Sequence, residues 1–169
     1  MKNQKYPLIF VVEDNSVYNT LIVNHLHIHK LTNTESFISG EECLKNIHRR
    51  PDIVIQDYLL GGINGVDVLV ATKKRYPETE FIFLSGQDSI EAAVNCLKYG
   101  AYDYIVKDPH ALNKLVDKIN KLMIHHERII SNKRFAHGIT LFIMALILII
   151  LIFAALTIMF PTTFSILGN

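Results

Sequence analysis

Short apolar runs alternate with longer helix-spaced segments along most of the chain, and this alternation constrains the fold more than any other feature. The runs lie at 8–12, 33–37, 53–56, 81–84 and 104–106. They are rich in β-branched and aromatic residues, and turn-formers or charges bound most of them, which is typical of strands. Five strands that alternate with five helices indicate βαβ units and an α/β fold whose parallel sheet is covered on both faces.

Apolar residues at helical spacing mark the five segments between and after these runs. In chain order they are Leu21, Ile22 and Leu26; Cys43, Leu44 and Ile47; Val66, Leu69 and Val70; Ala93, Val94 and Leu97; and Leu112, Leu115, Val116 and Ile119.

Polar residues with useful chemistry follow four of the predicted strands. Ligands of such sheets bind outside the carboxyl ends of the strands. Glu13 and Asp14 follow the first strand, Asp57 the third, Ser85 the fourth and Lys107 the fifth. Clustered carboxylates without His or Cys suit a hard cation such as Mg²⁺. A carboxylate can also act as a nucleophile that becomes an aspartyl phosphate, with a metal, a lysine and a hydroxyl neutralising the phosphoryl oxygens.

Four sequence stretches carry a family resemblance over about 6–125: VVED, DYLLGGING, FLSG and GAYDYIVKD. They resemble the receiver domains of bacterial two-component response regulators. The resemblance implies a doubly wound, flavodoxin-like five-stranded parallel sheet of order 2-1-3-4-5. It also implies a histidine kinase or phosphotransfer protein as phosphodonor. Each strand-end acid alone is equally consistent with a helix cap or turn residue, so the signal lies in the joint order and spacing.

By the same resemblance, Asp57 is the phosphoacceptor and a ligand of Mg²⁺. Asp14 would bind the ion directly, Glu13 mainly through water, and the backbone carbonyl of Leu59 would be a further protein ligand. The alternative is a receiver that serves only as a docking surface, but the positions that carry the chemistry are intact.

The resemblance also assigns the residues that respond to phosphorylation. Ser85 would hydrogen-bond the phosphoryl group, Lys107 would pair with it, and Tyr104 matches the aromatic residue whose rotamer follows phosphorylation. Two positions depart from the family. Gly61 stands where the family usually has Pro. Asp108 separates Lys107 from Pro109, which leaves open whether the Lys107–Asp108 peptide is cis.

Histidines and cysteines suggest no separate metal site. Of His25, His27 and His29, only His25 and His29 would share a face of a helix, and a metal site needs several convergent ligands. We expect them to face solvent. Cys43 and Cys96 follow no metal spacing and are expected to be reduced on buried helix faces.

The C-terminal part of the chain predicts a membrane anchor. From Ile139 to Phe160 there is no charge, Gly or Pro, and at about 1.5 Å per residue this run would span roughly 33 Å, the thickness of a bilayer core. The alternative is a buried core helix or an oligomerisation seam. We therefore predict a receiver at 1–125, a basic juxtamembrane stalk at 126–137, a transmembrane helix at 138–160 and a short tail at 161–169.

Charges beside the run predict its orientation. Segments rich in Lys and Arg beside a membrane span stay in the cytoplasm. Four basic residues lie before the run, and none lies after it in this sequence: Lys121, Arg128, Lys133 and Arg134. The apolar run at the N-terminus is too short for a signal peptide. We expect a single-pass protein of the cell membrane with a cytoplasmic receiver and its C-terminus outside.

The predicted function is a phosphorylation-dependent switch at a membrane that acts through contacts with a protein effector. The rivals are a phosphate sink or relay without its own output and a non-switching membrane scaffold. A formal net charge of +1 gives no sign of nucleic-acid binding. There is no Walker loop, GxSxG or HExxH, so we do not expect an enzyme that turns over a separate substrate.

A stalk that pairs two copies is a further expectation. No Gly or Pro occurs between His110 and His137. Positions spaced by alternating steps of four and three are occupied by Leu112, Val116, Ile119 and Met123, then by His126 and Ile130. Such a seam could pair in a homodimer. The alternative is that it packs on the sheet and continues as a linker.

Overall fold

The computed structural model describes residues 6–159, apart from the side chains at 126–138, 140, 141, 153 and 157–159. A parallel five-stranded sheet lies at the centre of the fold, in the order β2-β1-β3-β4-β5 that the family resemblance implied. All four strand pairs are parallel. The strands are β1 (Ile9–Val12), β2 (Thr34–Phe37), β3 (Ile53–Gln56), β4 (Glu80–Ser85) and β5 (Asp103–Val106).

Helices follow the strands in the expected alternation. Ser and Asn side chains begin the first four: Asn15, Ser39, Asn64 and Ser89 each accept backbone N–H groups of the first turn that would otherwise lack partners. The helices are α1 (Ser16–Ile28), α2 (Gly40–Asn46) with a short 3₁₀ turn (Ile47–Arg49), α3 (Gly65–Arg75), α4 (Ile90–Lys98) and α5 (Ala111–Met159).

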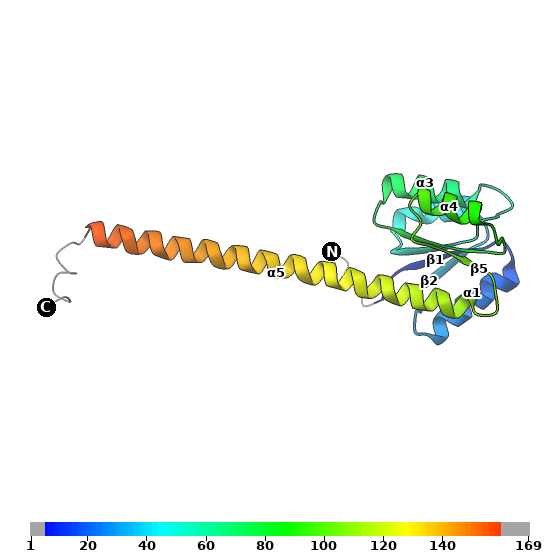
Figure 1. The fold of residues 1–169 in the computed structure, drawn as a ribbon, viewed down its shortest axis with the longest axis horizontal. Helices are drawn as coiled ribbons and strands as arrows, with labels where there is room; N and C mark the ends of the chain where they lie inside the picture. The colour runs from blue at the N-terminus through cyan, green and yellow to red at the C-terminus, as the bar shows by residue number, and fades with distance from the viewer. Residues whose placement is uncertain (1–5, 160–169) are drawn as a thin grey trace. The chain divides into compact units, whose positions relative to one another are not determined.

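Two apolar layers cover the sheet. Figure 1 shows α3 and α4 on one face, and α1 with the beginning of α5 on the other. Successive strand residues point to opposite faces, so Ile9 and Val11 pack with α1 and α5 while Phe10 and Val12 pack with α2, α3 and α4. This explains why the strand runs are apolar throughout rather than alternating.

The buried face of α4 differs from the residues that mark this helix in the sequence. Val94 is 58% exposed and Leu97 48% exposed, whereas Ala92 and Cys96 are buried, and Cys96 packs in the apolar layer with the strand residues Phe81 and Phe83. Small side chains spaced by four residues let the helix approach closely. Apolar residues occupy neighbouring positions at the same spacing, so the pattern alone did not choose between the two faces. Leu21 on α1 and Val70 on α3 are also exposed.

The cysteines are free and buried, as expected. Burial raises the pKa of each thiol, Cys43 and Cys96, to about 12, so both are unreactive thiols at neutral pH. The histidines are only partly as expected: His27 and His29 are exposed but His25 is half-buried. Among the described residues, no group of three or more metal ligands includes a histidine.

The chain divides into two units, Met1–Met123 and Ile124–Asn169, and α5 contributes residues to both. Within the part of the chain that the structure describes, no helix combines the length and hydropathy of a membrane span. The transmembrane helix expected at 138–160 is therefore not confirmed. The stalk side chains at 126–137, including Ile130, lie outside the described residues.

Candidate functional site

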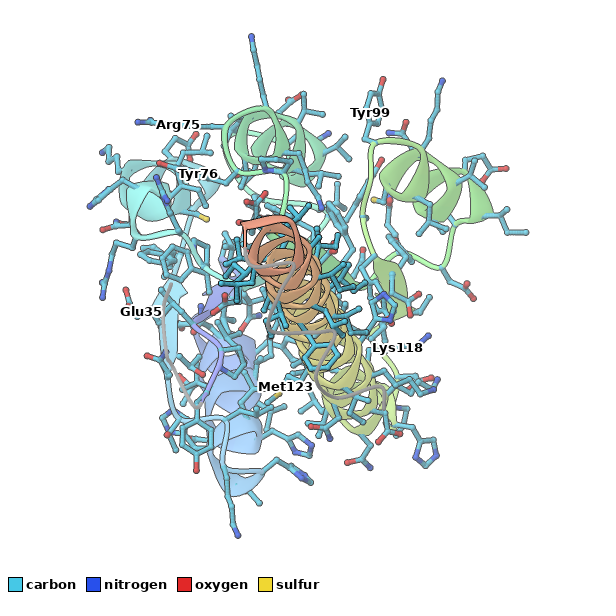
Figure 2. All side chains as sticks on the ribbon, turned by 90° about the vertical axis from the view of Figure 1, so that its left-hand side faces the viewer. Glu35, Arg75, Tyr76, Tyr99, Lys118 and Met123 are labelled. Carbon is cyan, nitrogen blue, oxygen red and sulfur yellow. The ribbon has the colours of Figure 1, made fainter. Side chains whose placement is uncertain are left out.

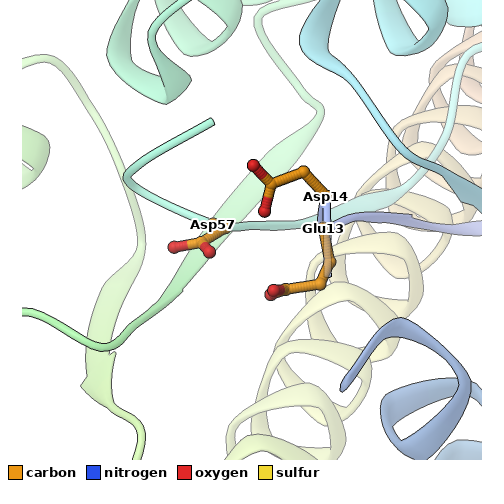
Figure 3. Close-up of side chains that lie close together, drawn as sticks. All are labelled: Glu13, Asp14 and Asp57. Carbon is orange, nitrogen blue, oxygen red and sulfur yellow. The ribbon is translucent and has the colours of Figure 1, made fainter. Parts of the chain in front are cut away.

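Three carboxylates meet at the carboxyl edge of the sheet. Glu13 and Asp14 directly follow β1, and Asp57 directly follows its neighbour β3. The Asp57 amide donates a 2.9 Å hydrogen bond to the Val12 carbonyl, which continues the ladder beyond the strand ends. Oxygen atoms of the three side chains consequently lie within 4.8 Å of one another (Figure 3). Glu13 is 2% exposed and Asp57 8% exposed, while Asp14 faces solvent.

Lys107 balances part of this negative charge. Its ammonium Nζ donates to Glu13 Oε2 at 2.7 Å and to Asp57 Oδ2 at 2.9 Å. The Lys107 amide donates to the Ser85 carbonyl at 2.7 Å, so β4 holds the backbone of this residue beside the site. Burial alone would lower the pKa of Lys107, but its bonds to the two carboxylates outweigh burial and raise this pKa above the ordinary value. The lysine is therefore an ammonium at neutral pH.

Burial raises the pKa of Glu13, and the nearby Asp57 carboxylate acts in the same sense, against the hydrogen bond from Lys107. One ammonium thus stands against three acidic groups. The excess negative charge favours a further cation at this edge. Carboxylate oxygens without sulfur or imidazole are donors for a hard ion, so Mg²⁺ fits the residues present.

Ser85 and Tyr104 lie on the neighbouring strands β4 and β5. Ser85 is the buried last residue of β4, and its Oγ accepts the Gln87 amide at 3.1 Å. The Tyr104 hydroxyl donates to the Gln87 carbonyl at 2.8 Å, and its ring lies against Tyr58 and Phe83. Burial raises the pKa of Tyr104, while a hydrogen bond with Ser85 acts to lower it. The serine and the tyrosine are thus joined through the same loop.

The loop after Asp57 is held by backbone donors. The Leu59 amide lies 3.4 Å from Asp57 Oδ1, and the Gly61 amide donates to Asp14 Oδ2 at 3.2 Å. A proline at position 61 would lack this donor, so the departure from the family adds a contact with a candidate metal ligand. At Gly65, a Cβ would lie 2.5 Å from the Asp57 carbonyl oxygen, which is why the helix begins with glycine there. The role of the Leu59 carbonyl remains a prediction.

The second departure from the family concerns Asp108. The described backbone has no cis peptide bond, so Lys107–Asp108 is trans. The Asp108 carboxylate accepts the His110 amide at 2.8 Å and pairs with Lys114 Nζ at 2.6 Å. The Lys114 ammonium, followed by the His110 amide, lowers the pKa of Asp108. These contacts anchor the turn between Lys107 and the start of α5.

Two further residues of the site are missing from the sequence-based expectations. Buried Asn19 donates from Nδ2 to the carbonyls of Glu13 and Phe37, at 3.1 and 3.2 Å, and so ties the ends of β1 and β2 to α1. Its signal was a polar residue on the helix face that also carries Ile22 and Leu26. Tyr18, whose ring centroid lies 4.5 Å from Lys107 Nζ, gave no such signal.

Comparison with known proteins gives a consistent result. The family model of the response regulator receiver domain matches residues 9–120. A putative NtrX-like response regulator of Rickettsia felis is 38% identical over 111 residues, which cover 64% of this chain and 23% of that protein. The luminescence regulatory protein LuxO of Vibrio campbellii is 32% identical over 91 residues, covering 50% of this chain and 20% of that protein. This chain therefore matches only about a fifth of the length of these relatives.

Solved structures show the same architecture. The receiver domain of NtrX from Brucella abortus is 30% identical with a TM-score of 0.62, covering 68% of this chain and 96% of that one. A CheY-like receiver domain protein from Methanospirillum hungatei has a TM-score of 0.67 over 73% of this chain and 98% of that one. At 24% identity the second likeness concerns the fold alone.

Proposed function

We propose, on the premise that this chain belongs to the response regulator receiver domain family, that it is a signalling phosphoprotein which accepts a phosphoryl group on Asp57. The observation that carries the proposal is the bridge from Lys107 to Glu13 and Asp57 inside the carboxylate cluster. This bridge joins the ends of β1, β3 and β5. An ion pair that only stabilised the fold would not need a third, exposed carboxylate at Asp14 beside it.

The chemistry uses the Asp57 carboxylate as nucleophile. One of its oxygens attacks the phosphorus of a phosphohistidine on a histidine kinase or phosphotransfer protein. The new O–P bond forms as the P–N bond breaks, and the leaving imidazole takes a proton from solvent. A carboxylate nucleophile has no proton to lose, so the step needs no general base. The reaction ends on the chain's own side chain, so we do not regard the chain as a turnover enzyme.

Glu13, Asp14, Asp57 and the Leu59 carbonyl are the residues that would hold Mg²⁺, which supplies charge neutralisation to the phosphoryl oxygens when bound. The ammonium of Lys107 also neutralises charge on the phosphoryl oxygens. Its ammonium already lies 2.9 Å from the acceptor oxygen, and it can follow the charge from the carboxylate to the phosphoryl group without leaving the strand edge.

Ser85 and Tyr104 provide a route from the site to the surface. A hydrogen bond from the Ser85 hydroxyl to the phosphoryl group would compete with its present bond to Gln87. Tyr104 holds the same residue through its hydroxyl, so a shift of this loop changes the position of the ring. The output is a changed contact with a protein effector.

The acceptor is tested with acetyl phosphate as phosphodonor. We expect wild type to be labelled in Mg²⁺, EDTA to prevent labelling, and Asp57→Asn to abolish it because an amide is not a nucleophile here. The control is Asp117→Asn, an exposed aspartate on α5, which should be labelled like wild type. Equal labelling of Asp57→Asn and wild type would refute the assignment.

We also propose that the C-terminal apolar run keeps the protein at the cell membrane with the receiver in the cytoplasm. The absence of any charge, Gly or Pro in 139–160 supports this, as do the exposed apolar side chains over 142–152. Resistance of the full chain to carbonate extraction, together with protease access to a C-terminal tag only from outside, is the expected result. Recovery of a soluble oligomer would instead assign the run to contacts between copies.

A further inference from the structure

We propose that Tyr18 is a positioning residue that holds the ammonium of Lys107 at the strand edge through the face of its ring. The Lys107 Nζ lies 4.5 Å from the Tyr18 ring centroid, inside the range of about 6 Å within which a cation is attracted by an aromatic face. The inference rests on the proposed function, in which Lys107 must stay beside the acceptor. It adds a residue that none of the strand ends contributes.

The backbone of Tyr18 is fixed relative to the site. Tyr18 lies in the first turn of α1, where its amide donates to the capping Asn15 Oδ1 at 3.0 Å. The next residue, Asn19, ties this turn to the Glu13 carbonyl at 3.1 Å. The Tyr18 side chain is half-buried and packs against the apolar core shared by α1 and α5. The ring is therefore presented to Lys107 by the same turn that holds Glu13.

The ring differs from the other partners of Lys107 in one physical respect. Glu13 and Asp57 attract the ammonium as anions, and both belong to the cluster that would bind the cation. Their pull weakens when their charge is neutralised. The attraction of the aromatic face does not depend on those charges. The ring of Tyr18 is thus a partner of Lys107 that is not itself a candidate ligand of the cation.

Substitutions at position 18 distinguish the effect of the aromatic ring face from the effects of side-chain volume and of the tyrosine hydroxyl. Tyr18→Phe keeps the face, and we expect its rate of labelling by acetyl phosphate to stay within about twofold of wild type. Tyr18→Leu keeps apolar bulk without a ring, and we expect the rate to fall about three- to tenfold. The matched control is Tyr99→Leu. Figure 2 shows Tyr99 at the C-terminal end of α4, and this tyrosine is 47% exposed.

A readout without metal or phosphodonor tests the contact itself. In the metal-free protein, the Lys107 Cε protons should show an upfield ring-current shift by NMR. The shift should persist in Tyr18→Phe and disappear in Tyr18→Leu. If Tyr18→Leu does not fold, a trifluorinated phenylalanine at position 18 keeps the shape while weakening the attraction of the ring face, and should slow labelling relative to Tyr18→Phe.

The outcomes separate this inference from the proposed function. Failure of wild type to be labelled would overturn the proposed function, whatever the NMR spectrum shows. Normal labelling of Tyr18→Leu, or an equal loss in Tyr18→Phe and Tyr18→Leu, would overturn the role of the ring. Absence of the ring-current shift in wild type would overturn it as well.

Discussion

At the scale of single residues, Lys107 has the largest electrostatic role in the site. Its side chain is only 18% exposed, and it is the ammonium that contacts both buried carboxylates. Removing one partner of a buried ion pair costs more than the pair contributes net, because the remaining charges lose both water and partner. The stability of the metal-free protein should therefore depend on Lys107.

We predict that Lys107→Ala lowers the free energy of unfolding by up to about 3 kcal/mol in EDTA. Added Mg²⁺ should recover more stability in this variant than in wild type, because the cation then neutralises carboxylates that no longer have an ammonium. Urea unfolding with and without Mg²⁺ measures both effects, and Lys98→Ala, at the end of α4, is the control. An equal Mg²⁺ effect in both proteins would contradict the prediction.

Leu59 should control the lifetime of the phosphorylated state. It is the second residue after the acceptor, its amide lies 3.4 Å from Asp57 Oδ1, and its side chain is 56% exposed. A leucine cannot orient an attacking water, so we expect slow loss of the phosphoryl group. The acyl phosphate of Leu59→Asn should hydrolyse about two- to tenfold faster, because one hydrogen bond to the attacking water lowers the barrier by an amount that corresponds to this factor.

The decay of labelled protein after removal of acetyl phosphate measures this rate. Leu97→Asn, an exposed leucine on α4, should decay like wild type. A Leu59→Asn protein that decays no faster would show that Leu59 does not shield the acyl phosphate.

At the scale of elements, α2 restrains the loop between β3 and α3. Glu41, in the first turn of α2, accepts the Ile63 amide through Oε1 at 2.9 Å. Hydrogen bonds from its own amide, from Ile63 and from Ser39 lower the pKa of Glu41. A carboxylate with a lowered pKa supports the folded arrangement at pH above its ordinary value of 4.5, and this support is lost as the pH falls through the lowered pKa.

We therefore predict that the Ile63 amide is protected from hydrogen exchange at neutral pH and that Glu41→Ala removes this protection. Labelling of Asp57 should also slow, because the loop carries Leu59 and Gly61. The matched control is Glu91→Ala, an exposed first-turn glutamate of α4 that bonds Ser89. Unchanged Ile63 exchange in Glu41→Ala would show that the loop is held by other contacts.

At the scale of the whole molecule, the site belongs to one unit. The unit Met1–Met123 contains the five strands of the described sheet, both apolar layers and the candidate site residues. Its last buried residue is Leu122, and Met123 packs beside it on the core. The sheet and its site should consequently fold without the rest of the chain.

A chain ended after His125 should unfold cooperatively and be labelled on Asp57 at the wild-type rate. Thermal unfolding followed by circular dichroism and labelling by acetyl phosphate check this, with the full chain as reference. The shortened chain should also leave the membrane fraction. A shortened chain that fails to fold would show that residues beyond 125 support the sheet.

The sequence by itself determined the elements and the list of strand-end residues. Strand 53–56 matches β3, and the other strands differ at their ends by about a residue, because apolar runs bounded by turn-formers are local signals. The general rule for parallel sheets then brings Glu13, Asp14, Asp57, Ser85 and Lys107 to one edge. The chemistry was predictable since every residue that carries it directly ends or follows a strand.

The tertiary structure alone decided how those residues are supported. Lys107 contacts Glu13 across 94 positions of sequence, and no local pattern identifies Tyr18 as another neighbour of Lys107. The polar Asn19 stands out on the apolar face of α1, but its sequence position does not tell which strand ends it joins. The buried face of α4 was equally undetermined, because Ala92 and Cys96 share their spacing with larger apolar residues. Such contacts depend on which side chains fit between packed elements, and that is a property of volumes brought together from distant parts of the chain.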